Sequence, residues 1–170
     1  MKNKLKVGLV IILSLLVLFN IKLYLDKEKD KGFLGIEFGE KISNLKVLDS
    51  YEAKNGEKFY NVEVDKKFRK EGYKYTVNVV PETNQVYIIS ARKIIEGKNF
   101  KEECFKERDQ IEQEINKNNN YYFGRNSIEN TDVYLNDNVF IYVACTDINN
   151  YIVLSYNDKS LYNKYIANQD

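Results

Sequence analysis

The sequence predicts an α+β fold, with a mainly antiparallel sheet packed by one amphipathic helix and an N-terminal transmembrane helix before it. Three observations predict this arrangement. A long apolar run lies near the N-terminus, segments with period two fill most of the remaining chain, and one segment between them has the helical period. The predicted parts are a signal-anchor helix over residues 1–25, a charged spacer over 26–31 and one extracytoplasmic domain over 32–170.

The N-terminal apolar run extends from Val7 to Ile21. A membrane-spanning helix needs about 20 residues, and this run suffices if the flanking Lys22 reaches the interface. Lys2, Lys4 and Lys6 precede the run, so the positive-inside rule leaves the N-terminus in the cytoplasm. We therefore predict a single-pass protein of the cell membrane whose C-terminal domain lies outside the cytoplasm.

Two alternatives to the anchor stay open. A cleaved secretory signal fits the basic start and the length of the run, although no Ala or Gly follows where cleavage would occur. Cleavage would make the protein secreted or periplasmic. A buried helix of a soluble protein is the other alternative, but a basic N-terminus before such a run is unusual in a core.

The first half of the domain is predicted to consist of hairpins. Residues 32–45 predict an extended entry and then a short helical turn. Strands over 45–52 and 58–64 follow, and Asn55-Gly56 between them is typical of a two-residue type I′ turn. A charged loop over 66–71 ends at Gly72. The clearest hairpin pairs a strand from Tyr73 to Val79 with one from Val86 to Ile95 across a turn at 81–85.

The period then changes to that of a helix. Asn99 is the predicted N-cap, and Glu102 completes a capping-box pattern with it. The apolar face of this helix is predicted to hold Phe100, Cys104, Ile111 and Ile115. Its end is expected between residues 116 and 120.

Strands resume after an asparagine-rich loop. They are predicted over 131–135, 138–147 and 151–157, with a turn at Asn149-Asn150 between the last two. A short terminal helix is expected over 160–167, with Leu161, Tyr165 and Ile166 pointing inward.

The two cysteines, Cys104 and Cys145, fall on the predicted inward faces of the helix and of the strand 138–147. In an oxidising compartment a lone pair of cysteines usually forms a disulfide. A bridge here would stabilise the fold by about 3–4 kcal/mol through loop closure. The alternative is two buried free thiols, which pack as small apolar groups. With an exported domain we predict the disulfide.

Composition excludes several classes of function. The chain has no histidine, and it has no phosphate-binding glycine loop, nucleophile elbow or Cys-x-x-Cys motif. The domain is slightly acidic once the lysines around the anchor are set aside, so it lacks the positive electrostatic field that attracts nucleic acid. We predict no enzyme activity, no catalytic residue, no cofactor and no metal site.

Carboxylates are the remaining candidates for chemistry. A carboxylate pair can hydrolyse glycosides without histidine. The acids of the predicted helix qualify by residue type only, and they are expected on a solvated face: Glu102, Glu103, Glu107 and Asp109. The aspartates in the last third of the chain do not have EF-hand spacing, so turn roles are predicted for Asp132, Asp137 and Asp147.

Aromatic residues suggest a recognition surface. Tyr121, Tyr122 and Phe123 form a predicted loop beside Arg125, and this composition is typical of protein interfaces. We therefore expect a membrane-anchored, extracytoplasmic binding protein of bacterial type that acts through protein contact, with an immunity or inhibitor protein as a specific form. An assembly factor of a cell-envelope complex is the first alternative, and a carboxylate hydrolase is the second.

Overall fold

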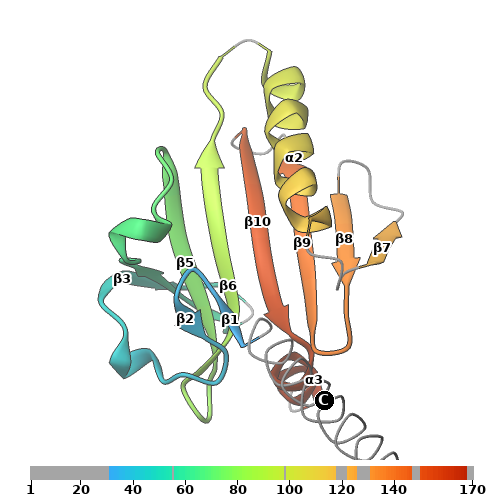
Figure 1. Ribbon diagram of the computed structural model, residues 1–170. Helices are drawn as coiled ribbons and strands as arrows, with labels where there is room; N and C mark the ends of the chain where they lie inside the picture. Colours follow the sequence, from blue (N-terminus) through green and yellow to red (C-terminus); the bar gives the residue numbers. More distant parts are fainter. Residues whose placement is uncertain are drawn as a thin grey trace, which may run out of the picture. The chain divides into compact units, whose positions relative to one another are not determined.

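The computed structural model describes residues 31–54, 56–97, 99–117, 131–146 and 150–167, and the backbone of 122–125. These residues form the predicted α+β fold, with one eight-stranded antiparallel sheet and two helices (Figure 1). The helices are α2 (Phe100–Asn116) and α3 (Lys159–Ala167). The strands are β3 (Val47–Glu52), β4 (Lys58–Val62), β5 (Tyr73–Val80), β6 (Gln85–Ile94), β7 (Tyr122–Arg125), β8 (Thr131–Leu135), β9 (Val139–Thr146) and β10 (Tyr151–Asp158).

The sheet consists of two four-stranded meanders. Its strand order is β3-β4-β5-β6-β10-β9-β8-β7, so each meander follows the chain order and the two meet where β6 pairs with β10. We call β3–β6 the N-terminal meander and β7–β10 the C-terminal meander. The segment that contains α2 leads from the centre of the sheet to its far edge at β7, and the chain then returns strand by strand. Both edges, β3 and β7, lie far from the central pair.

A small hairpin precedes the sheet, formed by β1 (Gly32–Phe33) and β2 (Ile36–Glu37). Its two-residue turn has positive φ at both positions, 59° at Leu34 and 79° at Gly35, as a type I′ turn requires. A Cβ at Gly35 would lie only 2.6 Å from the Phe68 ring, so this position needs glycine. A 3₁₀ turn over Ile42–Asn44 follows, which confirms the predicted extended entry and short helical turn.

The turn between β3 and β4 differs from the prediction. The Ala53 N–H donates to the Glu57 carbonyl, and the Gly56 N–H donates to the Ala53 carbonyl. These bonds enclose three residues rather than two, and Gly56 has a φ of 82°. This is the arrangement of a three-residue hairpin whose last position is left-handed. Asn55 itself lies outside the described residues.

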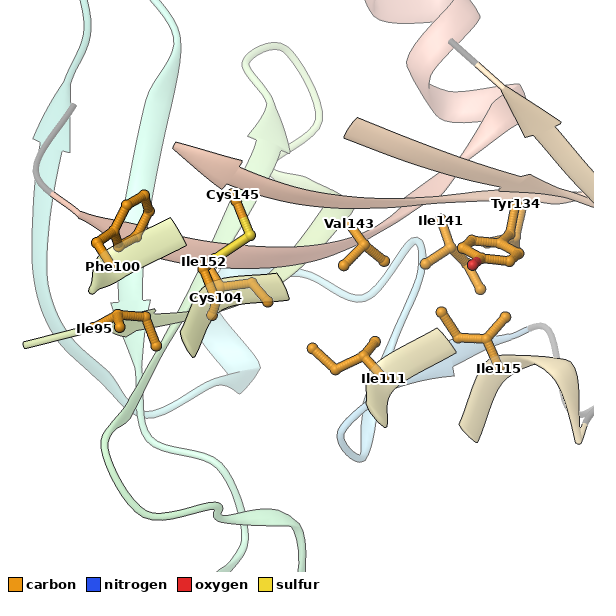
Figure 2. Packing of buried hydrophobic residues seen from close by; sticks show 11 residues of the cluster. Ile95, Phe100, Cys104, Ile111, Ile115, Tyr134, Ile141, Val143, Cys145 and Ile152 are labelled. Carbon is orange, nitrogen blue, oxygen red and sulfur yellow. A yellow bond between two sulfur atoms is a disulfide. The ribbon is translucent and has the colours of Figure 1, made fainter. Parts of the chain in front are cut away.

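One face of the sheet packs against α2 (Figure 1). The four predicted apolar positions of the helix are buried, as are the alternate residues of β9. Figure 2 shows Ile111 and Ile115 of the helix facing Ile141 and Tyr134 of the sheet. We call this cluster the disulfide core, and it consists of Ile95, Phe100, Cys104, Ile111, Ile115, Tyr134, Val139, Ile141, Val143, Cys145 and Ile152.

The predicted cysteine pair lies inside this core. The sulfur atoms of Cys104 and Cys145 are 2.14 Å apart and the Cα atoms 6.0 Å apart, at the distance of a disulfide. The bond links the first half of α2 to the end of β9 (Figure 2). It therefore ties the helix to the C-terminal meander.

The same face of the N-terminal meander has its own apolar cluster, the hairpin core. It is covered by short segments, since the β1–β2 hairpin and the two 3₁₀ turns (Ile42–Asn44 and Lys66–Phe68) supply Phe33, Leu34, Ile42 and Phe68. Its buried members are Ile36, Val62, Val64, Tyr75, Val77, Val79, Val86, Ile89 and Ala91. The alternation predicted for β5 is thus confirmed.

The opposite face of the sheet is contacted by α3. Asp158, the last residue of β10, accepts a hydrogen bond from the Leu161 N–H at 2.8 Å and so caps this helix. Tyr165 is buried, as predicted, against Tyr87 and Val80. Ile166 was expected to point inward, but it is 42 % exposed because it lies on the outer side of the helix.

The capping box predicted at the start of α2 is wrong. Asn99 is the N-cap of α2, but its side chain makes no capping hydrogen bond, so the predicted capping box does not form.

The predicted anchor and nearly all of the spacer lie outside the described residues. Among the helices that the structure describes, none combines the length and apolar character needed to cross a bilayer.

Candidate functional surface

Three of the four residues of the predicted partner surface lie in a strand rather than in a loop. Residues 122–125 form β7, which pairs with β8 and is an edge strand of the sheet. Arg125 is the register partner of Asp132, and Phe123 that of Tyr134. Tyr121 and the side chains of Tyr122, Phe123 and Arg125 lie outside the described part of the chain. Recognition by these four residues stays a prediction.

The helix acids that were candidates for carboxylate chemistry do not converge. Glu102, Glu103 and Asp109 are exposed, as expected for a solvated face. Glu107 differs, because it is half-buried between Lys93 Nζ at 2.7 Å and the Tyr73 hydroxyl at 2.9 Å. Burial alone would raise the pKa of Glu107, but the hydrogen bonds from Lys93 and Tyr73 outweigh this effect, so the pKa is lowered.

A second acid of α2 faces an acid of the sheet. Asp132 was predicted to lie in a turn, but it is a buried residue of β8. Its Oδ2 lies 3.2 Å from Nε of Arg108, which is also 3.7 Å from Oε1 of Glu112. Burial and the neighbouring Asp132 raise the pKa of Glu112, and the Tyr134 hydroxyl bonds to this carboxyl. Two carboxyl groups therefore share one guanidinium.

The charged side chains of Arg108, Glu112 and Asp132 connect α2 to β8. Neither Arg108 Nε nor Asp132 Oδ2 has an aligned hydrogen-bond partner, so their attraction is ionic rather than directional.

The other two aspartates of the last third do not join this cluster in the described residues. Asp137 is exposed between β8 and β9, and Asp147 lies outside the described residues. Within the described ranges, no group of three or more His, Cys, Asp or Glu residues could hold a metal ion.

The exposed apolar side chains concentrate on the edge strand β3. All six residues of β3 are exposed. Val47, Leu48 and Tyr51 are 40 %, 62 % and 46 % exposed, and the other large apolar side chains that the described residues expose are Ile94 and Ile166. Edge strands in soluble proteins are normally protected because their unpaired backbone can bind another strand. An exposed edge with three large apolar side chains is therefore a candidate interface.

A surface hollow of ≈ 480 Å³ lies beside this strand. β4 and β5 pair only from Phe59–Asn78 to Asn61–Thr76, and the hollow lies where the two strands no longer pair. We call it the β3 hollow. Its lining residues are Leu48, Asp49, Asn61, Val62, Glu63, Val64, Arg69, Tyr73, Lys74 and Tyr75.

The β3 hollow has an apolar base and a polar rim. Val62 and Val64 are buried at its base. On the rim, hydrogen bonds from Lys46 and Arg69 lower the pKa of Glu63, and Nε of Arg69 donates to the Val64 carbonyl at 2.8 Å. These bonds hold the rim charges in place.

One polar atom in the β3 hollow lacks a partner. Nδ2 of Asn61 donates to Asp49, but Oδ1 of Asn61 is buried and accepts no hydrogen bond. Buried polar atoms are almost always hydrogen-bonded, so an exception needs a reason. An N–H group of a bound partner would satisfy this oxygen.

Comparisons of this chain with protein-family models, with curated proteins and with solved structures gave no match. The functional argument therefore depends on the surface itself. Sequence reasoning predicted a strand over 45–52, which β3 confirms, but it did not predict that this strand is an edge, because nothing in residues 47–52 marks them as one. The one available signal was the apolar triplet Val47, Leu48 and Tyr51 outside a strict alternation.

Proposed function

We propose that this protein is a membrane-anchored, extracytoplasmic binding module that binds a protein partner through β3 and the β3 hollow, without catalysing a reaction. The observation that carries the proposal is the coincidence of the exposed strand with the unpartnered Oδ1 of Asn61. An inhibitor or immunity protein is the specific form that we favour, since such a protein needs a binding surface and no catalytic group.

The surface suits an extended segment of the partner. A strand added at β3 would find an unpaired edge, and its side chains would alternate between the two faces of the sheet. Leu48 lies at an irregularity in the β3–β4 register, between Val47 and Asp49, and it lines the hollow. An apolar side chain of the partner fits against Leu48 and Val62, while an N–H donor on another side chain that enters the β3 hollow fits Oδ1 of Asn61.

Site-specific photo-crosslinking tests the proposal. A benzophenone amino acid is placed at Leu48 or at Ile94 of the full-length protein in its native membrane. Ile94 is a matched control, since it is 56 % exposed against 62 % for Leu48 but lies on β6, away from the hollow. We expect a discrete crosslinked partner from position 48 and none from position 94.

A second arm separates binding from folding. Leu48→Asp should abolish recovery of the partner, whereas Ile94→Asp should leave it intact. Equal recovery with both variants, or identical crosslinks from both positions, would overturn the assignment of the binding surface to β3.

The export part of the proposal has its own test. In protein denatured directly from cells, Cys104 and Cys145 should resist alkylation, and they should gain two adducts after reduction, as measured by mass. Complete alkylation without reductant would contradict an oxidising location of the domain.

A further inference from the structure

A second hollow lies where the disulfide core meets the hairpin core, and we call it the junction pocket. Its walls come from α2, from the β1–β2 hairpin, from the segment around the 3₁₀ turn Lys66–Phe68 and from strands β5, β6 and β10. Its volume is ≈ 200 Å³. A cavity of about 150 Å³ already admits benzene, so the junction pocket is large enough for one ring or one branched apolar group.

A small residue of a central strand forms the floor of the junction pocket. Ala91 of β6 is the register partner of Tyr75 on β5 and of Leu154 on β10, so the three side chains lie side by side on the face toward α2. The methyl group of Ala91 is much shorter than its two neighbours. Space therefore remains above the sheet at this point, and Ile111 and Ile115 of α2 border it without filling it.

Aromatic rings form most of the wall of the junction pocket. The rings of Phe33 and Tyr156 stack with their centres 3.9 Å apart and their planes 13° apart. Phe68, Tyr73 and Tyr75 also line the pocket. Burial raises the pKa of Tyr156 to about 12, so its phenol is neutral at physiological pH. The interior of the pocket is therefore uncharged, and it suits an aromatic or aliphatic group.

The rim of the junction pocket carries one positive and one negative charge. Among the described residues that line it, Lys70 and Glu114 are the two ionised ones, and Nζ of Lys70 donates to Oε2 of Glu114 at 3.0 Å. Their side chains are 56 % and 64 % exposed. An exposed ion pair contributes little to stability, so each member can exchange the other for an opposite charge on a ligand at small cost.

We propose that the junction pocket binds a free α-amino acid with an aromatic or aliphatic side chain. The α-carboxylate pairs with Lys70, the α-ammonium pairs with Glu114, and the side chain occupies the hollow above Ala91. A ligand with a single charge complements one member of the pair and repels the other. Tyr73 and Tyr75 line both this pocket and the β3 hollow, but the amino-acid site does not depend on the protein partner proposed above.

Calorimetric titration of the detergent-solubilised full-length protein tests the proposal. The probes are L-phenylalanine, 3-phenylpropionate, which lacks the ammonium, and phenethylamine, which lacks the carboxylate. Each analogue loses one charge-assisted contact, so L-phenylalanine should bind about ten-fold more tightly than either, or better. Equal affinity for one of the analogues, or no saturable heat with either L-phenylalanine or L-leucine, would overturn the proposal.

Substitutions locate the binding in the junction pocket. Glu114→Gln should remove the advantage of L-phenylalanine over 3-phenylpropionate, since only the former has an ammonium to lose its partner. Glu102→Gln is the matched control, because Glu102 is also an exposed acid of α2 but does not line the pocket. Ala91→Leu should fill the floor and abolish binding, with thermal unfolding measured on the same sample; Glu114→Gln decides the question if that variant does not fold. Equal losses with Glu114→Gln and Glu102→Gln, or retained binding by folded Ala91→Leu, would contradict the site.

Two further probes distinguish a free amino acid from the end of a peptide. N-acetyl-L-phenylalanine has the carboxylate of a peptide C-terminus, and L-phenylalaninamide has the ammonium of a peptide N-terminus. Because each keeps only one of the two charges, both should bind more weakly than L-phenylalanine. Binding of either probe as tight as that of L-phenylalanine would overturn the assignment to a free amino acid.

Discussion

The two meanders of the sheet are held in different ways. The C-terminal meander packs against a 17-residue helix, and the Cys104–Cys145 bond ties that helix to β9. The N-terminal meander is covered by short turns and by the β1–β2 hairpin, and it ends at a strand that is exposed along its whole length. The difference supports our proposal that stability and recognition are divided between the two halves of one sheet.

Helix α2 contacts both meanders through acids whose pKa values shift in opposite directions. Glu107 bonds to Tyr73 of β5 and Lys93 of β6, in the N-terminal meander, and its pKa is lowered. Glu112 faces Asp132 and Tyr134 of β8, in the C-terminal meander, and its pKa is raised. Each contact therefore responds to pH with its own sign.

Removal of the disulfide should have the largest effect. The cysteines are 41 residues apart, and closure of such a loop contributes about 4 kcal/mol to the free energy of unfolding in the chain-entropy model. Cys104→Ala with Cys145→Ala should lower this free energy by about that amount, as measured by urea denaturation. Reduction of the wild-type protein is the matched control. A loss below about 1 kcal/mol would show that the C-terminal meander does not depend on the bond.

Shortening one side chain of the disulfide core should have the next largest effect. Ile141 is fully buried, and Ile141→Val removes one methylene from a closed core. The free energy of unfolding should fall by about 1 kcal/mol. Val47→Ala on β3 is the comparison, and its effect should be within about 0.5 kcal/mol because Val47 is exposed. Equal losses would remove the distinction between the two halves.

The contact of α2 with the N-terminal meander should weaken in acid. A lowered pKa means that ionised Glu107 stabilises the fold above its unfolded pKa of about 4.3, and that this stability is lost as pH falls through the folded value. Glu107→Gln should cost about 1 kcal/mol at neutral pH. Urea denaturation over a pH series should show wild type and variant converging in acid. A constant difference would contradict the ion pair.

The contact of α2 with the C-terminal meander should weaken as pH rises, the opposite of the contact through Glu107. A raised pKa means that Glu112 favours the folded state while protonated, and that this contribution is lost as pH rises through the folded value. Glu112→Gln mimics the protonated group, so it should stabilise the protein at neutral pH and have little effect in acid. The same pH series checks this. Destabilisation by Glu112→Gln at neutral pH would show that the ionised carboxylate is the favoured form.

The smallest effect on stability is expected at the proposed binding strand. Leu48 is 62 % exposed, so Leu48→Ala should change the free energy of unfolding by less than about 0.5 kcal/mol while weakening partner capture. Thermal unfolding and the crosslinking assay measure the two quantities on the same protein. A large fall in stability would mean that Leu48 belongs to the core rather than to an interface.

Local patterns in the sequence predicted most elements of the fold. The apolar face of α2 was correct at all four positions, because a helical stripe of Phe100, Cys104, Ile111 and Ile115 has a single way to face a sheet. The alternation in β5 and β9 predicted their inward faces for the same reason. The proximity of the two cysteines followed from these two faces together.

Features that depend on strand order could not be predicted in this way. Whether β3 is central or an edge is decided by pairings far along the chain, and the Tyr122–Arg125 segment became a strand because β8 offers it a partner. The type I′ geometry formed at Leu34-Gly35 rather than at Asn55-Gly56, since the β1–β2 register and the Phe68 ring impose it there. The unpartnered Asn61 Oδ1 arises only where β4 and β5 separate.

Native-state hydrogen exchange of the oxidised full-length protein tests the division between the two meanders most directly. The account predicts that amides of β9 and β10 exchange only through global unfolding, whereas amides of β3 exchange through local opening with a much smaller free energy. Protection of β3 equal to that of β9 would contradict it, because the proposed binding strand would then be as tightly held as the cross-linked core.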